Sequence, residues 1–190
     1  MNRRTAFTLT SMALQCVAAA LQTSHALAQE KQHVSYTVDA ANSKYTQQHF
    51  IDVGDSAGHQ VRSFEIHRTF PANEPVINGV KIKEQWTRGV SDYIDSNGTA
   101  NIYVVYVLEN GDKFFGHGAA LARNAGEGKY TAVVFGSITG GTGKLAGIQG
   151  TLRASGSAIP KSAGRHRVLD EQVIIRVPRD RLFSVSTKPS

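Results

Sequence analysis

Two tyrosines three residues apart, Tyr103 and Tyr106, are side chains whose type and spacing suggest chemistry. They lie in a β-branched run, in which successive side chains point to opposite faces, so one should face an interior and the other should face away. Tyr106 alternates with the apolar residues at 102, 104 and 108, which favours the interior position. A phenol there could donate a hydrogen bond to an epoxide or carbonyl oxygen, although a packing tyrosine with its hydroxyl at a rim fits equally well.

Glu65 and His67 form a second candidate pair, because residues two apart on a strand share a face. A buried Glu65 could stabilise a positive charge or act as a base. The alternative is a surface glutamate and histidine on a half-exposed strand. The strand alternates between two sides, which carry Phe64, Ile66, Arg68 and Phe70 on one and Ser63, Glu65, His67 and Thr69 on the other.

Trp86 and His117 complete the set of candidate ligand-binding residues. Trp86 lies on a strand face between two charged residues, where a ring can serve as a ligand platform, although the lone tryptophan of a small barrel is more often core or an end plug. His117 lies between two glycines. A metal site would require His49, His67 and His117 to converge from different strands, and we predict none.

The elements that must position these residues are strands. Short turns separate the apolar segments and no amphipathic helix is evident, which predicts an all-β antiparallel barrel or sandwich. A closed barrel of eight strands just fills with side chains or holds one small ligand. We expect an N-terminal arm or edge strand at 29–43, a C-terminal tail at 179–190, and a barrel domain at 44–178 with about eight strands near 44–53, 60–70, 80–93, 100–109, 113–123, 129–138, 145–159 and 168–177.

A glycine-rich segment at 139–143 joins two of these strands. A phosphate-binding loop would need a glycine at 138 and a hydroxyl at 145, but these residues are Ile138 and Leu145. A dinucleotide fingerprint would have to open a helix, and the residues that follow are a poor helix start. The segment therefore predicts strand, tight turn and strand. Glycines in the second strand mark a sharp bend or a close backbone approach.

This segment, Ser137-Ile-Thr-Gly-Gly-Thr-Gly-Lys-Leu-Ala-Gly-Ile-Gln-Gly150, resembles one that plant allene oxide cyclases and dirigent proteins share. Upstream, Tyr103-Val-Val-Tyr-Val-Leu-Glu-Asn-Gly-Asp-Lys-Phe-Phe-Gly-His-Gly118 is similar to their strand, turn and return strand. The resemblance covers about residues 100 to 155 well. It implies an eight-stranded, lipocalin-like barrel that assembles as a homotrimer and encloses an apolar cavity.

The resemblance also implies a function. Members of this group fix the conformation of a hydrophobic, oxygenated intermediate and use no cofactor, so the chain would be a cyclase or isomerase that works by orientation. Phe64-Glu65-Ile66-His67 resembles the start of the cyclase barrel, where the glutamate faces the cavity. Carried over, Glu65 would be the ionisable group of the cavity, with His67 beside it on the same face. We therefore take Glu65 and Tyr106 as the candidate steering groups, and His67, Tyr103, Trp86 and His117 as the candidate ligand-binding residues.

Two other functions remain open. The same barrel could be a non-catalytic carrier for a lipid-like or aromatic small molecule, or a structural protein filled with side chains. The small residues at 116–122 argue mildly for internal space. Convergence of Glu65, His67 and Tyr106 inside the cavity would favour the enzyme, whereas a purely apolar interior would favour the carrier.

The N-terminus predicts export. A basic start, an apolar stretch and the Ala26-Leu-Ala28 sequence before Gln29 are typical of a cleaved signal peptide at 1–28, which places the mature chain in the periplasm or outside the cell. The stretch is too short and too polar to span a membrane. Cleavage removes Cys16, the one cysteine, so we expect no disulfide or thiolate site. The remaining basic residues are mostly scattered, which argues against nucleic-acid binding.

Overall fold

The chain is a single all-β unit in the computed structural model, which describes residues 29–127, 129–158 and 166–178. The predicted signal peptide and C-terminal tail lie outside these ranges. Within them, no helix is long and apolar enough to cross a membrane. The strands are β1 (Gln29–Asp39), β2 (Ser43–Asp52), β3 (His59–Thr69), β4 (Val76–Ile77), β5 (Val80–Ile94), β6 (Asn97–Leu108), β7 (Lys113–Asn124), β8 (Tyr130–Gly141), β9 (Gln149–Ala158) and β10 (His166–Pro178).

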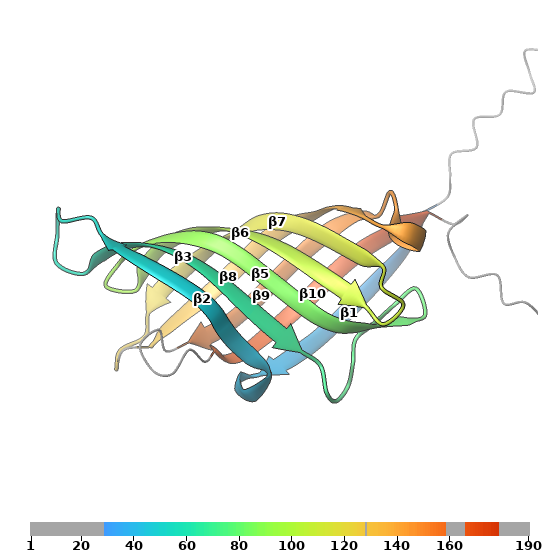
Figure 1. Ribbon diagram of the computed structural model, residues 1–190, viewed down its shortest axis with the longest axis horizontal. Helices are drawn as coiled ribbons and strands as arrows, with labels where there is room; N and C mark the ends of the chain where they lie inside the picture. The colour runs from blue at the N-terminus through green and yellow to red at the C-terminus, as the bar shows by residue number, and fades with distance from the viewer. Residues whose placement is uncertain (1–28, 128, 159–165, 179–190) are drawn as a thin grey trace, which may run out of the picture.

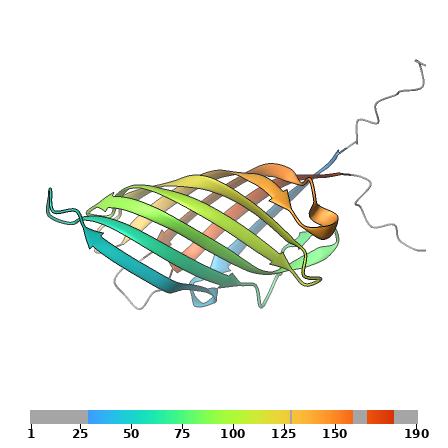
Figure 2. The ribbon, with the colours of Figure 1, turned by 45° about the horizontal axis from the view of Figure 1, so that its top comes forward.

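The strands form one antiparallel sheet in the order β1-β10-β9-β8-β7-β6-β5-β3-β2, and β4 pairs with β5. Figures 1 and 2 show this sheet rolled into a barrel-like shape with its strands inclined to the long axis. The expected all-β antiparallel fold is therefore present. A fully closed barrel is not, because β1 and β2 are the edges of the sheet and the described residues form no ladder between them.

The place where the two edge strands β1 and β2 are not paired, called the seam below, has a local cause. The two strands follow each other in the chain through a single 3-10 turn, Ala40–Asn42, and each then pairs away from the other, β1 with β10 and β2 with β3. A bulge between Tyr45 and Gln47 increases the twist of β2 near this turn. The segment 29–43, for which the sequence left an arm or an edge strand open, supplies β1 at the edge of the sheet.

The core fills the inside of the rolled sheet. Because strand side chains alternate between faces, each strand contributes every second residue to this interior. Tyr106 is fully buried there, as its alternation predicted, and it stacks on Phe114 at 4.2 Å between ring centroids. Other members of the main apolar cluster are Val38, Phe70, Ile77, Ile82, Ile102, Val104, Leu108, Ile138, Leu145, Ile148 and Leu152.

The glycine-rich segment forms a strand, a turn and a strand, but the turn lies later than predicted. β8 continues to Gly141, with a register shift where Gly116 of β7 faces Ile138 and Phe115 faces Gly140. A 3-10 turn at Gly143–Leu145 follows, and β9 begins at Gln149. Leu145 of this turn and Ile148 in the residues that follow it are buried, so this connection covers part of the core.

Glycines inside β7 and β8 permit a close approach of backbones and do not create internal space. A Cβ atom on Gly118 would lie 2.3 Å from the carbonyl oxygen of Phe135 and 2.7 Å from the Cα of Gly136. Gly116 is blocked in the same way by the carbonyl oxygen of Ser137. The small residues at 116–122, which the sequence suggested would leave a cavity, partly serve the tight curvature of the sheet.

We expect Gly118→Ala to lower the free energy of unfolding by about 1–3 kcal/mol, because the added methyl group overlaps backbone that cannot move aside. Denaturant unfolding followed by circular dichroism measures this change. The control is Ser137→Ala, an exposed residue in the neighbouring strand, which should change stability by less than about 0.5 kcal/mol. A Gly118→Ala variant as stable as the control would contradict this account of the curvature.

Candidate functional site

The candidate site is a cavity of about 70 Å³ inside the rolled sheet. Its wall is mainly apolar, and polar side chains line it from β2, β3, β5, β8 and β9. Register explains why β2, β3 and β5 meet there: β3 pairs with both β2 and β5, so its inward residues lie between theirs. Tyr130 of β8 does not pair with these strands and reaches Tyr45 across the interior. The lining residues are Tyr45, Arg62, Phe64, Ile66, Arg68, Gln85, Thr87, Tyr93, Ala100, Ile102, Val104, Ala120, Tyr130, Ala132, Val134, Leu152, Ala154, Gly156 and Ser157.

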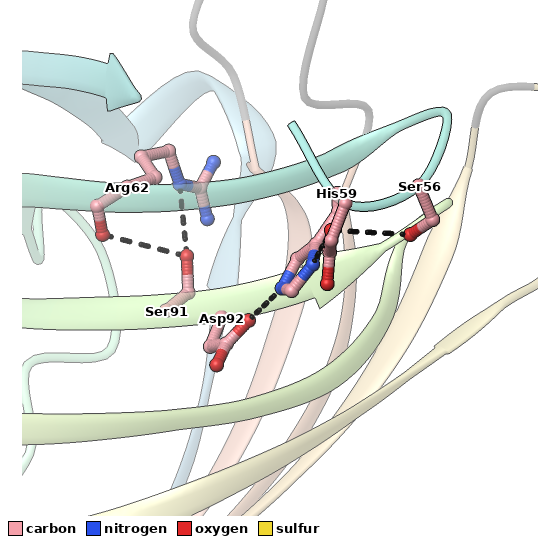
Figure 3. A network of polar contacts seen from close by, with 6 residues as sticks. Ser56, His59, Arg62, Ser91 and Asp92 are labelled. Atoms are coloured by element: carbon pink, nitrogen blue, oxygen red, sulfur yellow. Dashed lines mark hydrogen bonds and ion pairs between the residues drawn. The ribbon is translucent and has the colours of Figure 1, made fainter. Parts of the chain in front are cut away.

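Arg62 provides one cationic group of this cavity and is only 4% exposed. Its Nε donates to Ser91 Oγ at 3.3 Å, as Figure 3 shows, and its Nη1 donates to Gln48 Oε1 at 3.2 Å. Four aromatic rings surround the guanidinium, with centroids 5.0–5.8 Å from its central carbon, and these belong to Tyr45, Phe50, Phe64 and Tyr93. Ring faces attract a cation, so they offset part of the cost of burying this charge.

Tyrosine hydroxyls gather near Arg62. The hydroxyl groups of Tyr45 and Tyr130 are 3.1 Å apart, and Tyr93 packs edge-on against Tyr130. Burial, and then the neighbouring Tyr130, raises the pKa of Tyr45 far above its usual range. Burial also raises the pKa of Tyr93 to about 12. Tyr45 and Tyr93 therefore stay protonated near neutral pH and can donate hydrogen bonds, but they cannot act as bases there.

Arg68 is the second buried cation that lines the cavity, and it too is only 4% exposed. Its Nη1 donates to Thr87 Oγ1 at 2.7 Å and to Gln85 Oε1 at 3.4 Å, so its partners are neutral. Among the side chains that the structure describes, no carboxylate lies within 4.0 Å of Arg62 or Arg68. The interior therefore carries positive charge that its own acidic residues, as far as described, do not balance.

Glu65 lies on the outer face of the sheet, not in the cavity as the resemblance implies. Its carboxylate accepts hydrogen bonds from Thr46 Oγ1 at 2.6 Å and from Arg88 Nε at 2.7 Å. The Thr46 hydrogen bond and the nearby Arg88 hold the pKa of Glu65 below its ordinary value. The reason for its position is parity: the inward residues of β3 are the even-numbered Arg62, Ile66 and Arg68, and Glu65 belongs to the opposite set.

His67 and Trp86 also lie outside, paired across β3 and β5. Their rings stack at 4.1 Å between centroids with an interplanar angle of 16°. His67 Nε2 is 2.7 Å from Glu84 Oε2, and the guanidinium of Arg88 lies over the Trp86 ring at 5.2 Å. Trp86 is thus neither a plug nor a wall of the cavity.

The remaining candidates divide between the two faces. Tyr106 points inward but is covered by Phe114 and does not line the cavity. Tyr103 is 65% exposed on the outer face, where its ring centroid is 6.3 Å from that of its cross-strand partner His117. Glu65, His67 and Tyr106 therefore do not converge. The described residues also contain no cluster of histidine, cysteine, aspartate and glutamate that could hold a metal ion.

Sequence reasoning missed the two buried arginines, although a signal for them was present. Arg68 alternates with Ile66 and Phe70 on the apolar side of its strand, and Arg62 lies in the same register. Arginine is almost never fully buried without a partner. A charged residue that interrupts an inward apolar set is therefore a sign of a polar site.

A separate polar cluster lies at the N-terminal end of β3, next to the β2–β3 loop. His59 Nδ1 is 2.5 Å from Asp55 Oδ1, and its Nε2 is 2.7 Å from Asp92 Oδ1, as Figure 3 shows for Asp92. These hydrogen bonds, first that to Asp92 and then that to Asp55, raise the pKa of His59 above its ordinary value. A protonated His59 therefore ties the loop to β5.

We expect this cluster to make stability depend on pH. Because the pKa of His59 is raised in the folded chain, its contribution is complete below the pKa of an unfolded histidine, about 6.5, and is lost as the pH rises through the raised value. NMR titration of His59 and unfolding measured from pH 5 to 9 follow both effects. His59→Gln should remove this part of the decline, and His117→Gln should retain it; an unchanged profile in His59→Gln would refute the assignment.

Comparisons with known proteins give structural neighbours only. No family model and no curated protein matches the sequence. Two pterocarpan synthase dirigent proteins match 79% and 78% of this chain and 89% and 95% of their own, at 16% and 12% identity and TM-scores of 0.44 and 0.45. A pyocyanin demethylase matches 75% of this chain and 99% of its own, at 16% identity and a TM-score of 0.37. The structural neighbours are thus dirigent proteins and a demethylase.

Proposed function

We propose that this chain binds a small, mainly apolar molecule inside its rolled sheet. The observation that carries this proposal is the cavity itself, whose wall is aliphatic except for a few polar groups. Protein interiors usually pack with few voids larger than a water molecule. A concave apolar space with a few convergent polar side chains is the usual form of a small-molecule site.

The size of the cavity limits the ligand. About 70 Å³ is less than half of the roughly 150 Å³ that accommodates benzene in a protein core. A ligand that enters without rearrangement has few non-hydrogen atoms. A larger, lipid-like ligand requires the wall to move, and the seam between β1 and β2, where the described residues form no ladder, is where the sheet can widen.

A cofactor-free cyclase or isomerase is the second candidate, and the groups around Arg62 favour it over a passive carrier. The hydroxyls of Tyr45 and Tyr130 lie at the cavity wall together with the buried guanidinium. Protonated phenols and a fixed cation stabilise negative charge that develops on an oxygen atom of a bound intermediate. These residues would replace Glu65 and Tyr106 as the steering groups of such a reaction.

Export and assembly complete the proposal. The chain would act outside the cytoplasm after removal of residues 1–28, as its N-terminal sequence predicts. The outer face of β6, β7 and β8 supports assembly into the homotrimer that the resemblance implies, because it exposes large apolar side chains in neighbouring register positions. These are Tyr103, Phe115, Leu121, Val133 and Phe135.

Filling the cavity should abolish binding of a neutral apolar probe. Xenon enters small apolar cavities, so amide chemical shifts of residues such as Ala100 and Ile102 should change saturably under xenon pressure. Ala120→Leu adds three carbon atoms to the cavity wall and should reduce these shifts at least tenfold. Ala119→Leu is the matched control, since its side chain lies on the exposed face of the same strand. Absence of xenon-dependent shifts in the unmodified chain would favour a structural barrel filled with side chains.

Native mass spectrometry of the chain, purified from the organism that makes it, should show three copies that lack residues 1–28 and retain a small molecule. Phe135→Glu should convert the trimer into monomers, because it places charge on the exposed apolar face. Ala125→Glu, in the exposed β7–β8 turn, should leave the assembly intact. A chain of full length would contradict export, and a monomer before substitution would contradict the trimer.

A further inference from the structure

We propose that Arg68 and Ser43 form a subsite for the carboxylate group of the ligand, so that the molecule bound in the cavity is a small monocarboxylic acid with an apolar body. This inference rests on the proposed binding function and names the class of molecule that the cavity takes. It is carried by the burial of Arg68, by two unsatisfied donors and by the contrast with Arg62.

Among the side chains that the structure describes, the charge of Arg68 has no counter-charge. The side chain is 96% buried, its hydrogen bonds go to the neutral oxygens of Thr87 and Gln85, and no carboxylate of the described residues pairs with it. An ion removed from water costs several kcal/mol unless an opposite charge and further hydrogen bonds compensate it. A ligand anion at this position would supply both.

Two buried donors near this position have no hydrogen-bond partner among the described residues. One is Nε of Arg68, and the other is Oγ of Ser43, which is fully buried. Ser43 and Arg68 are directly paired across β2 and β3, so both side chains leave the same face with Cβ atoms about 5 Å apart. Unsatisfied buried polar groups are rare in native proteins. A carboxylate has two oxygens and can accept from both donors at once.

The buried charge of Arg62, by contrast, has aromatic rings and hydrogen-bond acceptors around it in the same interior. Its guanidinium lies among four aromatic rings and donates to Ser91 and Gln48. No ring contact of this kind involves Arg68 in the part of the chain that is described. The proposed carboxylate site therefore lies at Arg68 and not at Arg62.

The cavity extends from Arg68 past Ile66 and Phe64, and this wall suits the apolar body of an acid whose charged group is held at one end. A single guanidinium balances one negative charge, which favours a carboxylate over a phosphate monoester with its charge near −2 at neutral pH. The volume of about 70 Å³ favours a short acid.

The test compares propionate with its neutral analogue propionamide, titrated against the full mature chain at pH 7 by calorimetry and NMR. Propionate should bind at least tenfold more tightly. Arg68→Met should weaken propionate binding at least about 30-fold, because truncating one partner of a buried charge pair costs that much. Arg68→Lys keeps the charge but loses the planar fork, and should bind with intermediate affinity. Arg123→Met, an exposed arginine of β7, is the matched control and should bind as the unmodified chain does.

A stability measurement separates a binding role from a structural one. Replacing an uncompensated buried charge by an apolar side chain of similar size is neutral or stabilising, so Arg68→Met without ligand should unfold at the same denaturant concentration or a higher one. Marked destabilisation would mean that Arg68 serves to hold Thr87 and Gln85, and would overturn the proposal.

Other outcomes are also decisive. Equal binding of propionate and propionamide, or propionate binding that survives Arg68→Met, would overturn the carboxylate subsite while xenon binding still supported the cavity. Failure of both xenon and propionate would remove the proposed function as well. Octanoate tests whether the ligand is a fatty acid or a short acid. If octanoate binds more tightly than propionate and this binding depends on Arg68, the ligand is a fatty acid and the cavity wall moves. If only propionate shows Arg68-dependent binding, the ligand is a short acid.

Discussion

The structure depends on one constraint, the alternation of side chains along strands whose sheet is rolled on itself. Once the pairing of strands fixes the register, each side chain must point to either the inner or the outer face. Residues that are paired on neighbouring strands then point to the same face. Glycines at 116, 118 and 136 allow the curvature, because their missing Cβ atoms would otherwise meet the next strand. Only every second residue of each strand, whose side chain points inward, can therefore take part in chemistry in the interior.

This constraint sorts charge in an unusual way. On the outer face, the carboxylate of Glu65 pairs with Arg88, and that of Glu84 lies 2.7 Å from His67 Nε2, so the carboxylates there have polar partners close to solvent. On the inner face, Arg62 and Arg68 have neutral or aromatic partners among the described side chains. A buried charge of this kind is costly unless an opposite charge compensates it, and this cost is the basis for the proposed acidic ligand.

The two faces also divide the work of the molecule. The inner face carries tyrosine hydroxyls, two guanidinium groups and a mainly apolar wall, and these are the groups that the proposed function uses. The outer face of β6, β7 and β8 offers exposed aromatic and aliphatic side chains suited to contact with other copies. His59 links the β2–β3 loop to β5. It lies on β3 near Arg62, so the same strand carries both the loop contact and a buried cation of the interior.

The sequence by itself determined the strands, the antiparallel all-β class and the inward position of Tyr106, because alternation and turn residues are local properties. It also contained the alternation at 66, 68 and 70, which places Arg68 on the same side of the strand as Ile66 and Phe70. Only the tertiary structure decided that the candidate residues Glu65, His67, Trp86, Tyr103 and His117 lie on the outer face and that β1 and β2 leave a seam. It also decided that Arg68 Nε and Ser43 Oγ are buried with no hydrogen-bond partner among the described residues. Which face of a strand becomes the interior, and which strands are neighbours, depends on how the whole sheet rolls, and no single segment encodes that.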